Sequence, residues 1–135
     1  MKKAKNRLSN NHRRVLSTVL RIIEKDLNEM INLLSNPVKT SSFEVLSDLE
    51  EYEKNDKIVK INEILSEVKK IFKEFSFEKE YLEQSKIIES KKTKLWSILE
   101  DSYSKKLYRY GVIDPENSIK IDKIIKDLIE KINDI

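Results

Sequence analysis

The scarcity of turn-forming residues is the feature that most limits how this chain can fold. Its 135 residues include one glycine and two prolines, and 38% of the residues are charged. Few turns combined with abundant Lys, Glu, Ile and Leu are typical of long helices. The composition therefore predicts an all-α protein with short connections between its helices.

The spacing of apolar residues predicts where these helices lie. Leu16, Leu20, Ile23 and Leu27 follow one another in alternating steps of four and three, which is the helical repeat. Similar stripes predict four long helices, at about residues 10–35, 42–75, 78–110 and 115–134. On one ideal helix, the apolar residues before and after residues 53–57 would project from faces about 100° apart. This change of face predicts a break near residues 53–57. Short links between long amphipathic helices are typical of an up-and-down bundle with antiparallel neighbours.

Local signals mark several of the helix ends. The ring of Pro37 disfavours helical geometry at Asn36 and ends the first helix. Ser41 and Glu44 have the spacing of a capping box, which predicts a helix start. Gly111 suits a left-handed residue after a helix. Asp114-Pro115-Glu116 combines an N-cap, a proline at the first helical position and an acid in the first turn.

Length and composition also predict the domain organisation and the location. Residues 10–135 are long enough to form a single helical-bundle domain, preceded by a flexible basic arm at residues 1–9. No run of consecutive apolar residues exceeds two, so we expect neither a membrane span nor a signal peptide. The chain has no cysteine, which fits a reducing compartment. We therefore expect a cytoplasmic protein.

The residue inventory argues against most familiar enzyme sites. The only histidine is His12, whereas a di-iron site in a helical bundle needs two histidines. Zinc sites of His and Cys cannot be assembled without cysteine. A glycine-rich phosphate loop needs several glycines, and Gly111 is the only one in the sequence. The sequence therefore predicts a non-enzymatic protein without cofactor or metal.

Positive charge is concentrated at the beginning of the chain. Residues 1–23 contain seven lysines and arginines and no acid, whereas the rest contains 20 basic and 24 acidic residues. The candidate anion-binding residues are Lys2, Lys3, Lys5, Arg7, Arg13 and Arg14. They would neutralise phosphates of a nucleic acid or another polyanion. The alternative is a solvated arm, or one that contacts the acidic segment 44–56.

Two further polar residues have competing interpretations. Arg7 and His12 have the spacing used by some helical-bundle ribonucleases, and an exposed histidine on a bundle can also carry a phosphoryl group. On the helical wheel, however, His12 shares the angle of Val19 and Ile23, which favours a half-buried packing residue. Asp26 falls inside the same apolar arc. We expect it to form a structural pair with Lys91 or Lys92.

The function predicted from these observations is protein–protein interaction or self-association, without catalysis. Unequal helix lengths would leave apolar ends projecting, so we favour a homodimer. Binding of a nucleic acid or another polyanion through the basic arm is the alternative. A ribonuclease or phosphotransfer activity based on Arg7 and His12 ranks third.

Overall fold

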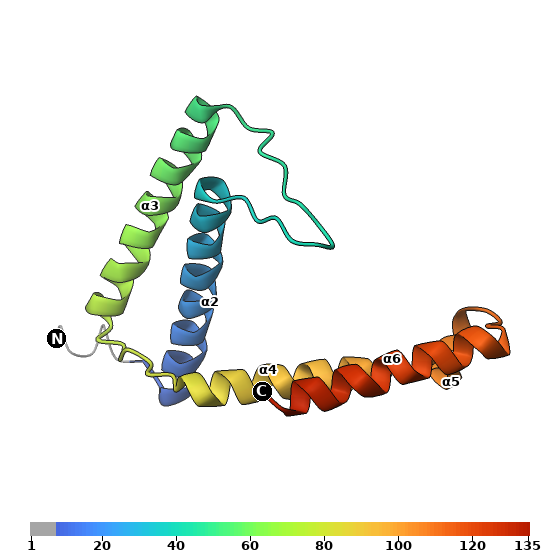
Figure 1. The fold of residues 1–135 in the computed structure, drawn as a ribbon. Helices are drawn as coiled ribbons and strands as arrows, with labels where there is room; N and C mark the ends of the chain where they lie inside the picture. Colours follow the sequence, from blue (N-terminus) through green and yellow to red (C-terminus); the bar gives the residue numbers. More distant parts are fainter. Residues whose placement is uncertain (1–7) are drawn as a thin grey trace. The chain divides into compact units, whose positions relative to one another are not determined.

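A computed structural model describes residues 8–135, and in this range the protein is all-α (Figure 1). Its long helices are α2 (Asn10–Ser35), α3 (Glu51–Glu74), α4 (Gln84–Glu100) and α6 (Pro115–Asn133). A short helix α5 (Ser104–Leu107) and a 3-10 turn η1 (Tyr108–Tyr110) lie between α4 and α6. The prediction of an all-α protein is confirmed.

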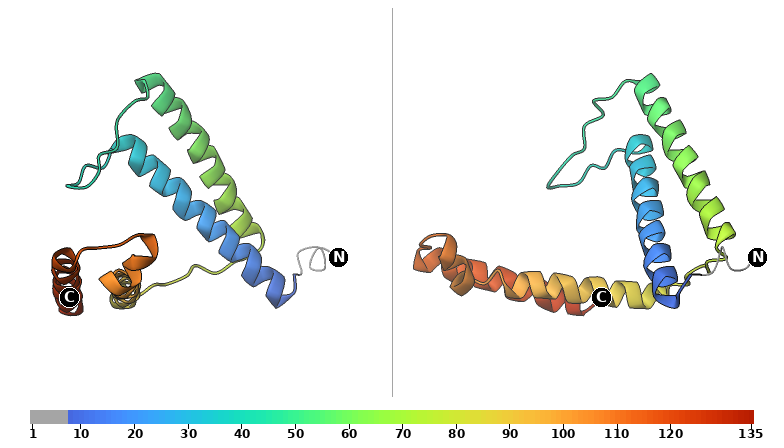
Figure 2. Two further views of the ribbon diagram at one scale, coloured as in Figure 1. Left: turned by 90° about the vertical axis from the view of Figure 1, so that its right-hand side faces the viewer. Right: turned by 180° about the vertical axis from the view of Figure 1, so that it is seen from behind.

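The helices pair into two antiparallel hairpins, shown from further sides in Figure 2. Helix α2 packs against α3, and α4 packs against α6. We call the α2–α3 pair hairpin 1 and the α4–α6 pair hairpin 2. The chain divides into two compact units, Met1–Lys79 and Glu80–Ile135, which contain one hairpin each. The up-and-down bundle of all four helices and the single domain over residues 10–135 stay predictions.

Hairpin 1 begins with the helix that the sequence predicts best. The side chain of Ser9 caps α2 by accepting a hydrogen bond from the backbone N–H of His12 at 3.1 Å. The helix ends at Ser35, directly before Asn36 and Pro37, so the boundaries predicted at residues 10 and 35 are confirmed. Leu20 and Leu27 of α2 are buried in the core of the hairpin.

The predicted helix start at residue 42 and the predicted break near residues 53–57 are both wrong, because residues 36–50 form a loop and α3 runs unbroken from Glu51 to Glu74. The hydroxyl group of Thr40 accepts hydrogen bonds from the backbone N–H groups of Ser42 and Phe43. Local bonds of this kind compete with the first turn of a helix. Helix α3 instead begins at Glu51, where the backbone N–H of Glu50 donates to Glu53 Oε1 at 3.4 Å.

The C-terminal end of α3 is closed by a Schellman motif. Phe77 N–H donates to the Phe72 carbonyl at 2.9 Å, and Ser76 N–H donates to the Lys73 carbonyl at 3.2 Å. The rings of Phe72 and Phe77 meet edge to face with centroids 5.5 Å apart, which supplies the apolar contact of this motif. Ser76 occupies the left-handed position, with φ of 53°, which is usually held by glycine.

Hairpin 2 contains a break that the predicted helix over residues 78–110 lacks. Helix α4 begins only at Gln84 and ends at Glu100. The carboxylate of Asp122 then accepts bonds from the Ser104 N–H and the Ser104 hydroxyl, both at 2.8 Å. These bonds start the short helix α5 and attach it to α6, so the long uninterrupted helix is wrong. Gly111 follows η1 with φ of 146°.

The last helix is confirmed with its cap. Asp114 Oδ2 accepts the backbone N–H of Asn117 at 3.2 Å, and Asp114 Oδ1 accepts the Asn117 side-chain amide at 2.7 Å. These hydrogen bonds hold the pKa of Asp114 below its ordinary value, the backbone bond contributing most. Ile125 and Ile129 of α6 are buried.

We predict that Ser76→Gly stabilises hairpin 1. A non-glycine residue in the left-handed region carries a steric cost of about 1 kcal/mol. The free energy of unfolding should rise by up to that amount in a denaturant titration. As a matched control, Ser66→Gly in the exposed middle of α3 should lower it by about 0.5–1 kcal/mol. Equal effects of the two substitutions would contradict this description of the α3 end.

We also predict that the cap of α6 depends on pH. Because the folded-state pKa of Asp114 is lowered, the charged cap stabilises α6 above the unfolded-state pKa of about 3.9. That stabilisation is lost as the pH falls through the folded-state pKa. Asp114→Asn keeps a capping side chain but does not titrate. The Tm difference between the wild type and Asp114→Asn should shrink between about pH 7 and pH 2, and a constant difference would refute the prediction.

Candidate functional site

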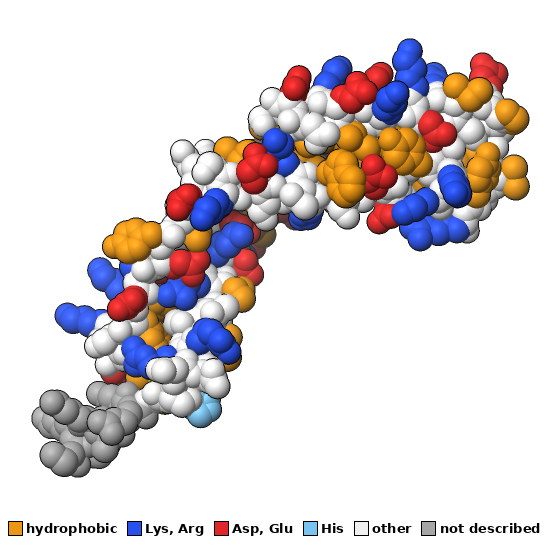
Figure 3. All heavy atoms as spheres, turned by 90° about the horizontal axis from the view of Figure 1, so that it is seen from below, with side chains coloured by type: hydrophobic (Ala, Val, Ile, Leu, Met, Phe, Trp, Pro, Cys, Tyr) orange, Lys and Arg blue, Asp and Glu red, His pale blue; other side chains and the backbone are white. Residues whose placement is uncertain are grey.

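The structure separates the basic residues that the sequence groups together. Lys2, Lys3, Lys5 and Arg7 lie outside the described residues 8–135. His12, Arg13 and Arg14 lie on the first turn of α2. His12, for which we expect partial burial, is instead exposed (Figure 3, pale blue). Arg14 is also exposed, whereas Arg13 is partly buried.

Arg13 binds the end of α3. Its guanidinium group donates to the carbonyl oxygens of Phe75 at 2.8 Å and Ser76 at 3.2 Å. The same group lies 5.0 Å from the centroid of the Phe77 ring. Carbonyl groups at a helix C-terminus lack partners within the helix and carry the negative end of its dipole. Part of the positive charge assigned to anion binding is therefore used inside hairpin 1.

Arg21 makes the same kind of contact further along the chain. Its guanidinium group donates to the Glu78 carbonyl at 2.7 Å and to Ser17 Oγ at 3.5 Å. It also lies 5.7 Å from the centroid of the Phe72 ring. We call Arg13 and Arg21, with the carbonyls of Phe75, Ser76 and Glu78, the arginine clamp. The sequence signal for it is weak, because it consists of two arginines eight residues apart on α2 and the aromatic segment 72–77.

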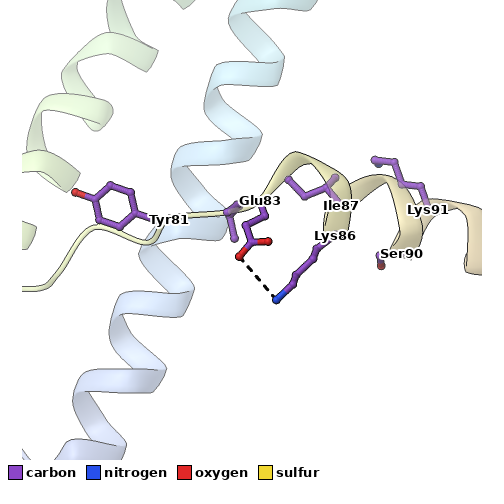
Figure 4. Close-up of a pocket in the computed structure, with 7 residues that line it drawn as sticks. Tyr81, Glu83, Lys86, Ile87, Ser90 and Lys91 are labelled. Atoms are coloured by element: carbon purple, nitrogen blue, oxygen red, sulfur yellow. Dashed lines mark ion pairs between the residues drawn. The ribbon is translucent and has the colours of Figure 1, made fainter.

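No group of three or more His, Asp or Glu residues among residues 8–135 is arranged to hold a metal ion. No helix in this range is long and apolar enough to cross a membrane. A hollow of about 400 Å³ at the beginning of α4 is lined by Tyr81, Ile87 and Ser90, and by a Glu83–Lys86 ion pair at 3.8 Å (Figure 4). Tyr81 is 86% exposed, so this hollow does not exclude water from a reacting group.

Hairpin 1 leaves an apolar surface uncovered, which we call face 1. It consists of Val15, Val19, Ile22, Ile23 and Met30 of α2 and Ile64 of α3, each 38–59% exposed. Among the described apolar side chains of α2 and α3, only Leu20, Leu27, Ile61 and Val68 are buried. Val19 lies about 100° around α2 from Leu20, so the contact with α3 cannot cover it. The apolar arc of α2 is wider than one neighbour can bury.

Asp26 lies inside face 1. It is within about 20° of Val19 on the wheel, and it is exposed. The expected partner Lys92 has its ammonium group elsewhere, 3.3 Å from Glu89 Oε1 and 2.8 Å from the Ile135 backbone oxygen. Because Asp26 is exposed, its carboxylate does not need a charged partner within hairpin 1. Its carboxylate is instead a charge inside an apolar surface.

Hairpin 2 leaves a similar surface, which we call face 2. It consists of Ile87, Leu95 and Ile98 of α4 and Ile124 and Leu128 of α6, each 40–52% exposed. On the helical wheel of each helix, these exposed residues lie to the same rotational side of the residues that form the α4–α6 contact. Because the two helices are antiparallel, this places both stripes on one side of the hairpin. Figure 3 shows hydrophobic patches exposed between charged side chains.

Lys91 lies inside face 2. It is within about 20° of Ile98 on the wheel of α4, and it is exposed. Figure 4 shows Lys91 and Ile87 on the same side of α4, away from the Glu83–Lys86 pair. Each hairpin therefore presents an apolar face that also contains charged side chains, among them Asp26 in face 1 and Lys91 in face 2.

The exposed area is large for a chain of this size. The protein exposes 11,747 Å². Two separate compact bodies of these lengths, with residues 1–7 counted as fully extended, would expose about 9,700 Å². The excess of roughly 2,000 Å² comes from surface that neither hairpin buries, on the helices and on the exposed loop of residues 36–50.

Comparisons of the chain with models of protein families, with curated proteins and with solved structures found no match. The function is therefore inferred from the surface chemistry of the two hairpins.

We predict that the arginine clamp stabilises hairpin 1. Arg13→Ala removes charge-assisted hydrogen bonds and a cation–π contact, and it should lower the free energy of unfolding by about 1–3 kcal/mol. Arg14→Ala is the matched control, since its neighbouring exposed side chain should contribute less than about 0.5 kcal/mol. A denaturant titration measures both. Equal losses would mean that the clamp does not form in solution.

Proposed function

We propose that the protein is a non-catalytic helical interaction protein that self-associates as a dimer through face 1 and face 2. The observation that carries this proposal is the uncovered apolar surface on both hairpins. Side chains of Val, Ile and Leu that are 38–59% exposed recur along α2, α4 and α6. Contiguous exposed apolar patches larger than a few hundred Å² mark interaction surfaces in soluble proteins.

The available area fits a stable association. A standard protein–protein interface buries about 800 Å² of each partner, and the excess exposed surface here is roughly 2,000 Å² per chain. Obligate homodimers often have no stable folded monomer. The apolar core of the two hairpins is small and consists of Leu20, Leu27, Ile61, Val68, Ile125 and Ile129. Such a small core fits a chain that folds stably only as a dimer.

Association would also complete the packing expected from the sequence. Two hairpins that meet by their apolar faces form a four-helix arrangement with antiparallel neighbours. The bundle would then be made between chains and would bury the stripes that a single hairpin leaves exposed. We propose the cytoplasm as its location, on the absence of cysteine from the sequence.

Binding of polyanions is not proposed as a second function. Of the six basic residues considered for it, Arg13 donates to the Phe75 and Ser76 carbonyls. Arg14 is the one exposed candidate in the described part of the chain. No contact among residues 8–135 assembles a phosphate site around it.

We predict that a charge placed in face 2 weakens self-association. Leu128→Glu puts an unpaired carboxylate into a surface that the dimer would cover, and it should raise the dissociation constant at least about tenfold. Sedimentation velocity over a concentration series measures this constant. Val112→Glu is the matched control, because Val112 is 98% exposed in the loop before α6. Its dissociation constant should equal that of the wild type.

The same sedimentation velocity series can refute the proposed self-association. A wild-type chain that sediments as a monomer at every concentration would refute self-association. Equal weakening by Leu128→Glu and Val112→Glu would show that face 2 is not the surface involved.

A further inference from the structure

We infer that the basic segment of residues 1–7 docks on the acidic end of hairpin 1 in a second copy of the chain. The acidic end consists of six residues in the loop before α3 and in the first turns of α3: Glu44, Asp48, Glu50, Glu51, Glu53 and Asp56. This inference rests on the proposed self-association and specifies which ends of the two chains meet. In a two-fold dimer the contact would form twice, because each chain supplies one basic segment and one acidic end.

The two ends of hairpin 1 carry opposite charge when every charged residue is counted. The end that contains residues 1–20 and 66–79 has ten lysines and arginines against three acids, a formal net charge of +7. The end that contains residues 28–60 has four lysines against seven acids, a net charge of −3. Unlike ends of two copies attract each other and like ends repel. Charge therefore favours a dimer in which the basic end of one hairpin 1 lies beside the acidic end of the other.

The acidic end has carboxylates that are available to a further cation. Asp48 and Glu50 are exposed and form no ion pair within the described part of the chain. Glu51 is also exposed, and its Oε1 lies 3.8 Å from Lys54 Nζ. An ion pair at this distance on the surface contributes little free energy, so it does not prevent Glu51 from binding another lysine or arginine.

The segment of residues 1–7 is too short to reach the acidic end of its own hairpin. Figure 1 shows the start of α2 and the start of α3 at opposite ends of hairpin 1. Asp48 lines a hollow with Leu33 and Leu34, near the end of α2. From Asn10 to Leu33 the helix rises about 35 Å, whereas seven residues span at most about 25 Å when fully extended. A second copy of hairpin 1 in the opposite direction would bring its acidic end within this reach.

Charge reversal at each of the two sites tests the inference. The segment variant is Lys2→Glu/Lys3→Glu/Lys5→Glu, and the end variant is Asp48→Lys/Glu50→Lys/Glu51→Lys. In the dimer of either variant alone, both contacts join like charges. Sedimentation velocity at an ionic strength of about 0.01 M, where screening is weak, should show a dissociation constant at least about tenfold above that of the wild type. At about 1 M the Debye length is about 3 Å, and the difference should largely disappear.

The matched controls reverse the same number of charges on hairpin 2, outside face 2. They are Lys105→Glu/Lys123→Glu/Lys126→Glu for the segment variant and Asp127→Lys/Glu130→Lys/Asp134→Lys for the end variant, all at exposed positions. Each control has the net charge of the variant that it matches and should dissociate like the wild type. Far-UV circular dichroism checks that every variant keeps its helices.

Mixing the two variants tests whether the contact joins two chains. The segment variant has an acidic segment and an acidic end, and the end variant has a basic segment and a basic end. Both contacts of a mixed dimer therefore join opposite charges again. Native mass spectrometry of an equimolar mixture, with one variant isotope-labelled, should show mixed dimers in excess over both homodimers.

Three results would overturn the inference. Folded segment and end variants that dimerise like the wild type, with Leu128→Glu still disruptive, would remove this contact while the proposed self-association stands. Homodimers and mixed dimers in statistical proportion would show that the segment does not bind the acidic end of a second copy. A wild-type chain that is monomeric throughout would remove the proposed function together with this inference.

Discussion

A helical hairpin can bury only the sides on which its two helices face each other, and the structure follows from this limit. In α2, Leu20 and Leu27 occupy the buried side, while Val19, Ile23 and Met30 lie next to it and stay exposed. The same division separates Ile125 and Ile129 from Ile124 and Leu128 in α6. The free energy gained by apolar burial is proportional to the area removed from water. A further layer over the hairpins, as in the dimer we propose, would bury this exposed apolar area and add to their stabilisation.

The arginine clamp holds the end of α3 against α2. Arg13 and Arg21 hold the carbonyls that follow α3, and their guanidinium groups lie over Phe77 and Phe72. Carbonyl groups at a helix end lack partners within the helix, and the arginines of α2 donate to those that follow α3. The two arginines thus fix the closed end of hairpin 1. Face 1, on another side of α2, contributes nothing to this contact and remains available.

The sequence predicts the helices well where a local signal acts alone. Asp114-Pro115 and Asn36-Pro37 mark boundaries that the structure confirms. The predictions fail where a local signal competes with another bond. The Ser41–Glu44 spacing resembles a capping box, but the Thr40 hydroxyl takes the nearby N–H groups for a turn. The break after Glu100 depends on Asp122, which is distant in the sequence.

The site predictions also fail where the outcome depends on residues that are distant in the sequence. Periodicity places Asp26 in an apolar arc, yet it cannot tell which part of a wide arc meets the neighbouring helix. The expected burial of Asp26 and His12 assumed that the whole arc is covered, whereas both residues are exposed. Arg13 was expected to bind an external anion, and the backbone of its own chain provides the acceptors. These contacts join residues about sixty positions apart, which no local pattern encodes.

The dependence of thermal unfolding on protein concentration tests the central claim most directly. If the uncovered faces are buried in a dimer, folding and association are coupled, and the Tm must rise as the protein concentration is increased. We expect a single transition whose midpoint increases by several degrees over about a hundredfold range of concentration. A midpoint that stays constant over this range, with a monomeric mass throughout, would contradict the claim that the hairpins are stabilised by a second copy.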